Sequence, residues 1–170
     1  CTIFAKNYLS QARVLTESFL AQHPDGVVYG LLCDKLDGYY DPGDERFVTV
    51  PVDDLNIPDL PEMVYKYDIV ELLTAVKARF LAHLFATTAV QKLCYIDPDI
   101  LFVSPIDEIW ALLEAHNIVV LPHLTERIKT DDDRIAVLTG RMPLCCHLER
   151  ELAKPTHPPG RPRQGLACVR

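Results

Sequence analysis

Just past its midpoint the chain reads Lys92-Leu-Cys-Tyr-Ile-Asp97-Pro-Asp99-Ile-Leu-Phe-Val-Ser104. Apolar runs without alternating polar residues are typical of strands that are buried in a parallel sheet. Two carboxylates, Asp97 and Asp99, interrupt this run, and such groups are costly to bury unless they are paired or bound to metal. Because ligands bind at the carboxyl ends of strands in open parallel sheets, the acidic pair predicts a ligand site at a strand end.

Strand and helix signals alternate on both sides of this stretch. Before it, we expect strands over 1–5, 27–33 and 47–50, helices over 10–22 and 67–86, and a loop over the proline-containing residues 52–62. From Lys92 onward, we expect a strand over 92–96, a continuing or new strand over 100–103, a helix over 105–115 and a strand over 117–121. This order predicts an α/β fold with a mainly parallel sheet flanked by helices. The family resemblance described below implies that the sheet binds nucleotide and is incomplete.

Composition divides the chain near residue 138. The chain has 170 residues, 49% hydrophobic and 24% charged, which is ordinary for a globular protein and excludes a disordered or collagen-like chain. Residues 1–138 have a net charge of −11 and residues 139–170 one of +4, which together give −7; the second segment also holds 5 of the 13 prolines. We therefore predict a domain over 1–138, to which the resemblance described below assigns nucleotide-sugar binding, and an irregular, basic tail rich in proline and cysteine over 139–170.

Several classes of function are disfavoured by composition. No run approaches the ~20 apolar residues that span a bilayer, so we expect no transmembrane segment. Net acidity argues against a nucleic-acid partner, which requires clustered Lys and Arg. Cys33 and Cys94 lie within apolar runs and no Cys-x-x-Cys occurs, which indicates a reducing, cytoplasmic setting. The pair Cys145-Cys146 fits no familiar zinc-finger spacing.

The acidic pair suits a hard divalent cation. Residues two apart on an extended chain point to the same side, and Pro98 stiffens the link, so we expect Asp97 and Asp99 to face one ion. Mg²⁺ and Mn²⁺ favour carboxylate and water ligands and commonly bind substrate phosphates as well. The same residues also fit a plain acidic turn between two strands.

The motif also carries a family resemblance. Tyr95-Ile-Asp-Pro-Asp-Ile-Leu-Phe-Val-Ser-Pro-Ile-Asp-Glu-Ile-Trp110 resembles the metal-binding Asp-x-Asp segment of nucleotide-sugar glycosyltransferases with the GT-A fold, in particular the retaining, glycogenin-like branch and related bacterial proteins. Ile3-Phe-Ala-Lys-Asn-Tyr8 is similar to the first strand and nucleotide-contacting loop of that family. Glu71-Leu-Leu-Thr-Ala-Val-Lys77 is similar to its segment with a basic contact. The resemblance covers about residues 1–128.

This resemblance implies roles for individual residues. Asp97 and Asp99 would bind Mn²⁺ or Mg²⁺ and the diphosphate, and Asp97 would also contact the ribose. The base and ribose would lie against the loop of Ala5, Asn7 and Tyr8. Lys77 would be the basic contact, a role for which Arg79 competes.

The implied activity is transfer of a sugar from a nucleotide-sugar donor to a hydroxyl of a saccharide, lipid or protein acceptor, with retention of configuration. The distal metal-binding histidine of the family has no match, and we do not assign that role to His123. Two alternatives stay open. The first is a truncated or frameshifted relative of the glycosyltransferases that only binds nucleotide. The second is a phosphatase of the haloacid-dehalogenase type, although in that family the Asp-x-Asp lies on the first strand.

Overall fold

The computed structural model describes residues 1–120, 147–150 and 167–168, and two compact units are distinguished within the chain. The first unit comprises Cys1–Val90 and Pro98–Pro105. The second comprises Gln91–Asp97 and Ile106–Arg170. The acidic motif therefore spans a boundary, because Asp97 belongs to the second unit and Asp99 to the first.

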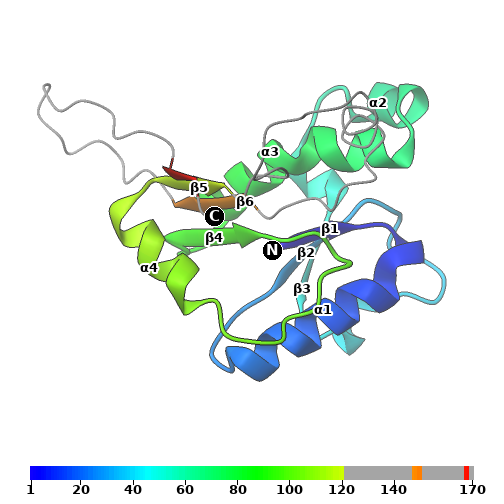
Figure 1. The fold of residues 1–170 in the computed structure, drawn as a ribbon. Helices are drawn as coiled ribbons and strands as arrows, with labels where there is room; N and C mark the ends of the chain where they lie inside the picture. Colours follow the sequence, from blue (N-terminus) through cyan, green and yellow to red (C-terminus); the bar gives the residue numbers. More distant parts are fainter. Residues whose placement is uncertain (121–146, 151–166, 169–170) are drawn as a thin grey trace, which may run out of the picture. The chain divides into compact units, whose positions relative to one another are not determined.

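A parallel three-stranded sheet forms the centre of the first unit (Figure 1). Its strands are β1 (Thr2–Phe4), β2 (Tyr29–Leu32) and β3 (Val48–Pro51), in the order β1-β2-β3. The register pairs Ile3 with Leu31 and Leu31 with Val50, and all three of these side chains are buried. Successive residues are buried in β1 and β2, so both faces of these two strands are covered, which explains why they read as apolar runs; in β3 only Val50 is buried.

Gly30 in β2 is required by close aromatic packing. The rings of Phe4 and Phe47 meet edge to face with centroids 5.4 Å apart. A Cβ added to Gly30 would come within 2.9 Å of Phe4 and 2.8 Å of Phe47, so any side chain there would displace both rings. The glycine thus allows the two aromatic rings to pack over the backbone of the central strand.

Helices cover both faces of this sheet (Figure 1). Helix α1 (Leu9–Gln22) lies on one side and α3 (Ile69–Thr87) on the other, with the short α2 (Leu60–Lys66) before α3. α3 begins with a capping box in which Asp68 and Glu71 satisfy each other's backbone N–H groups. Both long helices bury residues at helical spacing, which are Leu9, Ala12, Leu15 and Thr16 in α1 and Leu72, Val76, Phe80, Leu81 and Leu84 in α3.

Three short 3₁₀ segments connect these elements. They are η1 (Lys6–Tyr8), η2 (Pro42–Asp44) and η3 (Val52–Leu55). η1 follows β1 directly and leads into α1, so it lies at the carboxyl edge of the parallel sheet.

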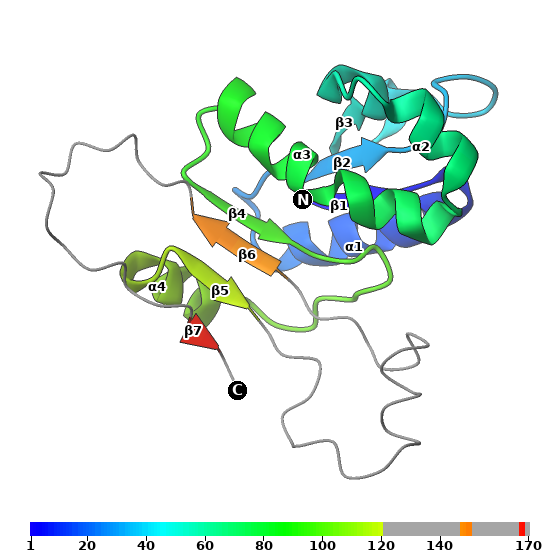
Figure 2. The same ribbon diagram turned by 90° about the horizontal axis from the view of Figure 1, so that it is seen from above.

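The second unit contains a mixed sheet (Figure 2). Its order is β4-β6-β5-β7, with β4–β6 and β5–β6 antiparallel and β5–β7 parallel. The strands are β4 (Lys92–Tyr95), β5 (Ile118–Val120), β6 (His147–Arg150) and β7 (Ala167–Cys168), and α4 (Asp107–Ala115) precedes β5. The expected parallel pairing therefore holds throughout the first sheet, whereas the second sheet includes antiparallel pairs.

Two local predictions are wrong. Residues 52–62, expected to be a loop, contain η3 and the start of α2, because Pro61 falls in the first helical turn, where its missing N–H costs nothing. Residues 100–103, expected to be a strand, form none, and Leu101 and Val103 are exposed. Phe102 instead anchors this segment within the first unit, since its N–H donates to Ser18 Oγ (3.1 Å) and its ring meets Phe19 edge to face.

Two further findings concern the surface and the tail. Within 139–170, β6 and β7 are strands, and the remaining residues lie outside the described ones.

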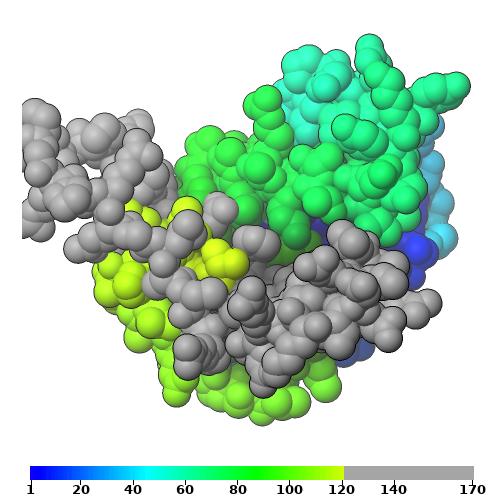
Figure 3. Space-filling model, turned by 45° about the horizontal axis from the view of Figure 1, so that its top comes forward, coloured from blue at the N-terminus to red at the C-terminus, as the bar shows by residue number. Residues whose placement is uncertain are grey.

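α2 and the first turn of α3 lie at the surface of the first unit (Figure 3), where Val64, Tyr65, Tyr67, Ile69 and Val70 are exposed. Of the helices in the described ranges, none combines the length and apolar character needed to cross a membrane.

Candidate functional site

Asp97 follows β4 and has an unusual hydrogen-bonding environment. Tyr95, the last residue of β4, is buried and donates its hydroxyl proton to Asp97 Oδ1 at 2.8 Å. The second oxygen, Oδ2, is also buried, yet it has no hydrogen-bond partner within the described part of the chain. A buried carboxylate oxygen without a donor is energetically costly, and a bound cation would remove that cost.

Asp99 has a different environment. It is exposed and lies in a turn with Pro98, four residues beyond Tyr95, where β4 ends. β4 ends at Tyr95, so Asp97 and Asp99 both lie beyond the strand, and the expectation that the two carboxylates face one ion stays a prediction. Proline has a fixed φ and lacks an N–H group, which favours the change from strand to turn at this point.

The described protein groups around Asp97 would supply only part of the coordination shell of a hard cation. No group of three or more His, Cys, Asp or Glu side chains suited to a metal occurs among the residues that the structure describes. Asp97 would supply one orphan oxygen. That is compatible with Mg²⁺-type binding, in which one or two carboxylates are completed by water and by substrate phosphates.

The loop after β1 exposes two of its predicted nucleotide contacts. Tyr8 N–H donates to Ala5 O at 2.8 Å and closes the η1 turn. The Asn7 and Tyr8 side chains are exposed, whereas Ala5 is only 5% exposed. Asn7 and Tyr8 are therefore accessible to a ligand at the carboxyl end of β1, while Ala5 can offer little beyond its backbone.

Lys6, which sequence reasoning overlooked, ties this loop to the segment after β2. Its N–H donates to Asp34 Oδ2 at 2.6 Å. Its Nζ donates to Asp37 Oδ1 at 2.5 Å and to Asp37 O at 2.8 Å, and it lies 5.7 Å from the centroid of the Tyr39 ring. This hydrogen bond and charge from Lys6 lower the pKa of the Asp37 carboxyl. The sequence signal that could have indicated these contacts is the pair Asp34 and Asp37, which follows β2, the neighbour of β1 in the sheet.

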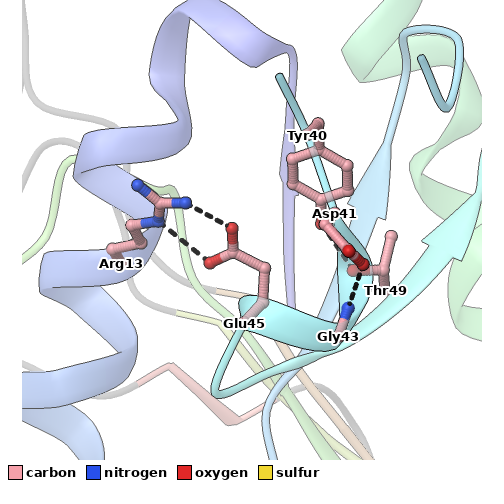
Figure 4. A network of polar contacts seen from close by, with 6 residues as sticks. All are labelled: Arg13, Tyr40, Asp41, Gly43, Glu45 and Thr49. Carbon is pink, nitrogen blue, oxygen red and sulfur yellow. Dashed lines mark hydrogen bonds and ion pairs between the residues drawn. The ribbon is translucent and has the colours of Figure 1, made fainter. Parts of the chain in front are cut away.

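A second polar network holds the other end of the β2–β3 connection (Figure 4). Arg13 on α1 donates to both carboxylate oxygens of Glu45, from Nε at 3.0 Å and from Nη2 at 2.6 Å. The Glu45 side chain is 1% exposed and that of Arg13 52%, so the pair is half shielded from water. The Glu45 hydrogen bond raises the pKa of Arg13, and burial raises the pKa of the neighbouring Tyr40.

The two candidate basic contacts lie on α3 in the first unit. Lys77 is half-buried and Arg79 is exposed. Residues two apart on a helix do not face the same side, so one ligand cannot take both side chains from the same direction. The helix therefore separates the two alternatives that the sequence left open, and a substitution at each position distinguishes them.

Other candidate side chains contribute less. Burial raises the pKa of the Cys33 thiol to about 12, so this cysteine stays neutral and is a poor nucleophile or metal ligand. His123, Cys145 and Cys146 lie outside the described residues.

The parallel three-stranded sheet flanked by helices defines an α/β fold, and comparison with solved structures matches it to a glycosyltransferase fold. The chain is similar to the crystal structure of the galactosyltransferase LgtC in complex with donor and acceptor sugar analogs, with a TM-score of 0.52 and 17% identity. It is similar to an active-site mutant of LgtC with the same TM-score and 16% identity. In both cases the match covers 88% of this chain and 56% of the other, so the chain spans little more than half the length of LgtC.

At this identity the similarity shows the fold alone. It supports a GT-A-like, glycosyltransferase-like architecture and gives no support for the glycogenin-like branch in particular. No protein-family model matches the sequence. No curated protein sequence matches it either.

Proposed function

We propose that this chain binds a nucleotide sugar with the help of a divalent cation, Mn²⁺ or Mg²⁺, and transfers the sugar to an acceptor hydroxyl. One observation carries the proposal: a buried Asp97 oxygen, without a donor among the residues that the structure describes, follows a strand end in a glycosyltransferase-like fold. A carboxylate held in this way is suited to a metal ligand, because metal binding removes the cost of leaving it unpaired.

The proposed roles follow the chemistry of each group. Asp97, with Oδ1 oriented by Tyr95, and Asp99 would hold the cation. When bound, the cation supplies positive charge that neutralises the leaving diphosphate. Asn7 and Tyr8, with the backbone of Ala5, would hold the base and ribose. Tyr8 is 43% exposed and could stack on a base.

Lys77 would neutralise part of the diphosphate charge from α3. We further propose retention of configuration, as in the glycogenin-like branch and related bacterial proteins that the sequence resembles. The LgtC structure, with its donor and acceptor sugar analogs, supports a saccharide as one acceptor class. We also propose a cytoplasmic setting, because Cys33 and Cys94 lie within apolar runs of a sequence that has no Cys-x-x-Cys.

Calorimetry on the full chain tests the binding half of the proposal. A panel of UDP, GDP and ADP is titrated with and without MnCl₂. We expect binding of one diphosphate that requires the metal, is lost in Asp97→Asn, and is kept in Asp25→Asn, which removes an exposed carboxylate from the turn after α1. Absence of metal-dependent binding for every nucleotide contradicts the proposal.

Product analysis tests the chemical half. Release of nucleoside diphosphate from a nucleotide sugar is the expected result. Release of phosphate from a phosphomonoester would favour the phosphatase alternative. Binding without turnover of any donor would favour the relative that only binds nucleotide.

A further inference from the structure

The β2–β3 connection is attached to the segment after β1 at two places. Near its start, Asp34 and Asp37 bind Lys6. Near its end, Glu45 binds Arg13. Asn7 and Tyr8 lie between Lys6 and Arg13 in sequence, so the proposed nucleotide-contacting residues are bracketed by two attachments to the same connection.

The two attachments differ in what they contribute to stability. Glu45 is buried, so loss of Arg13 would leave a buried charge uncompensated, which is strongly destabilising. The Asp37 side chain is 65% exposed, and ion pairs of this kind add little to stability. The contacts of Lys6 are therefore better explained by the geometry they impose than by the stability they add.

Lys6 is well suited to impose geometry. Its side chain is only 14% exposed although its partner is solvated, and Nζ reaches both the carboxylate and the backbone carbonyl of Asp37. Its own N–H is held by Asp34, which restrains the backbone directly before Asn7. Charge-assisted hydrogen bonds of this kind are short and directional. Gly38, with φ of +68°, allows the connection to turn beside these contacts.

We propose that Lys6 is a positioning residue for the nucleoside half of the binding site. By joining residues 34–39 to η1, it holds Asn7 and Tyr8 in the conformation in which they contact base and ribose. This inference rests on the proposed function. Without Lys6, the loop is ordered only when ligand binds, and the entropy of that ordering lowers affinity.

The experiment compares Lys6→Met and Lys6→Arg with Lys35→Met in the full chain. Lys35 is exposed, lies in the same connection and carries the same charge, so it controls for charge alone. Hydrogen exchange without ligand follows peptides covering 5–9 and 33–40. Calorimetry with MnCl₂ follows the preferred nucleoside diphosphate and, separately, inorganic pyrophosphate, which has no base or ribose.

In Lys6→Met we expect faster exchange in both peptides and about three- to tenfold weaker binding of the nucleoside diphosphate. Pyrophosphate binding should be unchanged, Lys6→Arg should recover most of the loss, and Lys35→Met should resemble the wild type. A merely structural role would weaken both ligands alike, and that result overturns the inference. Unchanged exchange in Lys6→Met also overturns it.

Failure of the proposed function is recognised separately. A wild-type chain that binds no nucleotide contradicts that function and overturns the ligand-positioning half of the inference. The exchange comparison still decides whether Lys6 couples the two loops, because it needs no ligand.

Discussion

Glu45 in the first unit has a buried side chain and Asp97 in the second unit has a buried Oδ2 atom, and the two carboxylates differ in their hydrogen bonding. Both oxygens of Glu45 accept hydrogen bonds from the Arg13 guanidinium. Asp97 receives one hydrogen bond from a neutral tyrosine, and its other oxygen receives none in the described part of the chain. A paired buried charge holds structure together, whereas an orphan one has capacity left for a ligand.

The largest effect is expected from Asp97→Asn. Removing the proposed metal ligand should weaken metal-dependent nucleotide binding by at least about 100-fold, beyond the ~10–100-fold that loss of a ligand's orienting partner costs. Thermal stability without metal should stay the same or rise, because a poorly compensated buried charge is removed. Calorimetry and thermal denaturation measure the two effects. A large fall in melting temperature with binding intact would place Asp97 with Glu45, as a structural carboxylate.

Arg13→Met should be the most destabilising change of this set. It leaves Glu45 buried without its cation, and we expect a loss of about 2 kcal/mol, below the full cost of breaking a buried pair because Arg13 is half exposed. Urea denaturation measures the loss. The double variant Arg13→Met with Glu45→Gln should recover part of it. If Arg13→Met leaves the free energy of unfolding unchanged, the ion pair with Arg13 does not stabilise the fold, and pairing does not explain the difference between Glu45 and Asp97.

A smaller effect is expected from Tyr95→Phe. The phenyl ring keeps the buried packing, but Asp97 Oδ1 loses its donor. We expect metal-dependent nucleotide affinity to fall about tenfold, because partners that orient a ligand carboxylate tune metal binding. Tyr29→Phe, in β2 of the first unit, is the matched control. Equal affinity in Tyr95→Phe and wild type would show that Asp97 needs no orienting group.

The smallest effect concerns Asp37, an exposed carboxylate that contrasts with both buried ones. Lys6 lowers its folded pKa, so the contribution of the ion pair is present above the unfolded value of about 3.9 and is lost as pH falls through the lower folded pKa. Carboxyl NMR titration should show a midpoint below 3.9 in the wild type. In Lys6→Met the midpoint should return toward the ordinary value. An unshifted wild-type midpoint would contradict the contact.

β1 and β2 could be predicted because parallel strands buried on both faces leave an apolar run in the sequence. Residues 100–103 show the limit of that signal. They are as apolar as a strand, yet they form none, and Phe102 is anchored by Ser18 and Phe19, more than eighty residues away. α2 was missed for the opposite reason, since Pro61 was read as a loop signal although proline is favoured in a first helical turn.

The candidate site shows the same division. Asp97 stands out in sequence because charge is costly between apolar neighbours. The tertiary structure alone shows that Tyr95 donates a hydrogen bond to Asp97 Oδ1 and that Oδ2 has no donor among the described residues. Lys6 gave no local signal, because its partners follow the next strand, about thirty residues along the chain.

Local chemistry was thus readable from the chain alone: the alternation of elements, the apolar strands, and the acidic pair with its glycosyltransferase-like flanks. Folding decided which charges are paired. Partners such as Lys6 and Asp37, or Arg13 and Glu45, meet across intervening elements, and a carboxylate's cost depends on the donors and water around it. The spacing of residues in the sequence shows neither which charged partners meet nor which donors surround a carboxylate. For this reason Glu45 and Asp97, both carboxylates, could be distinguished only from the tertiary structure.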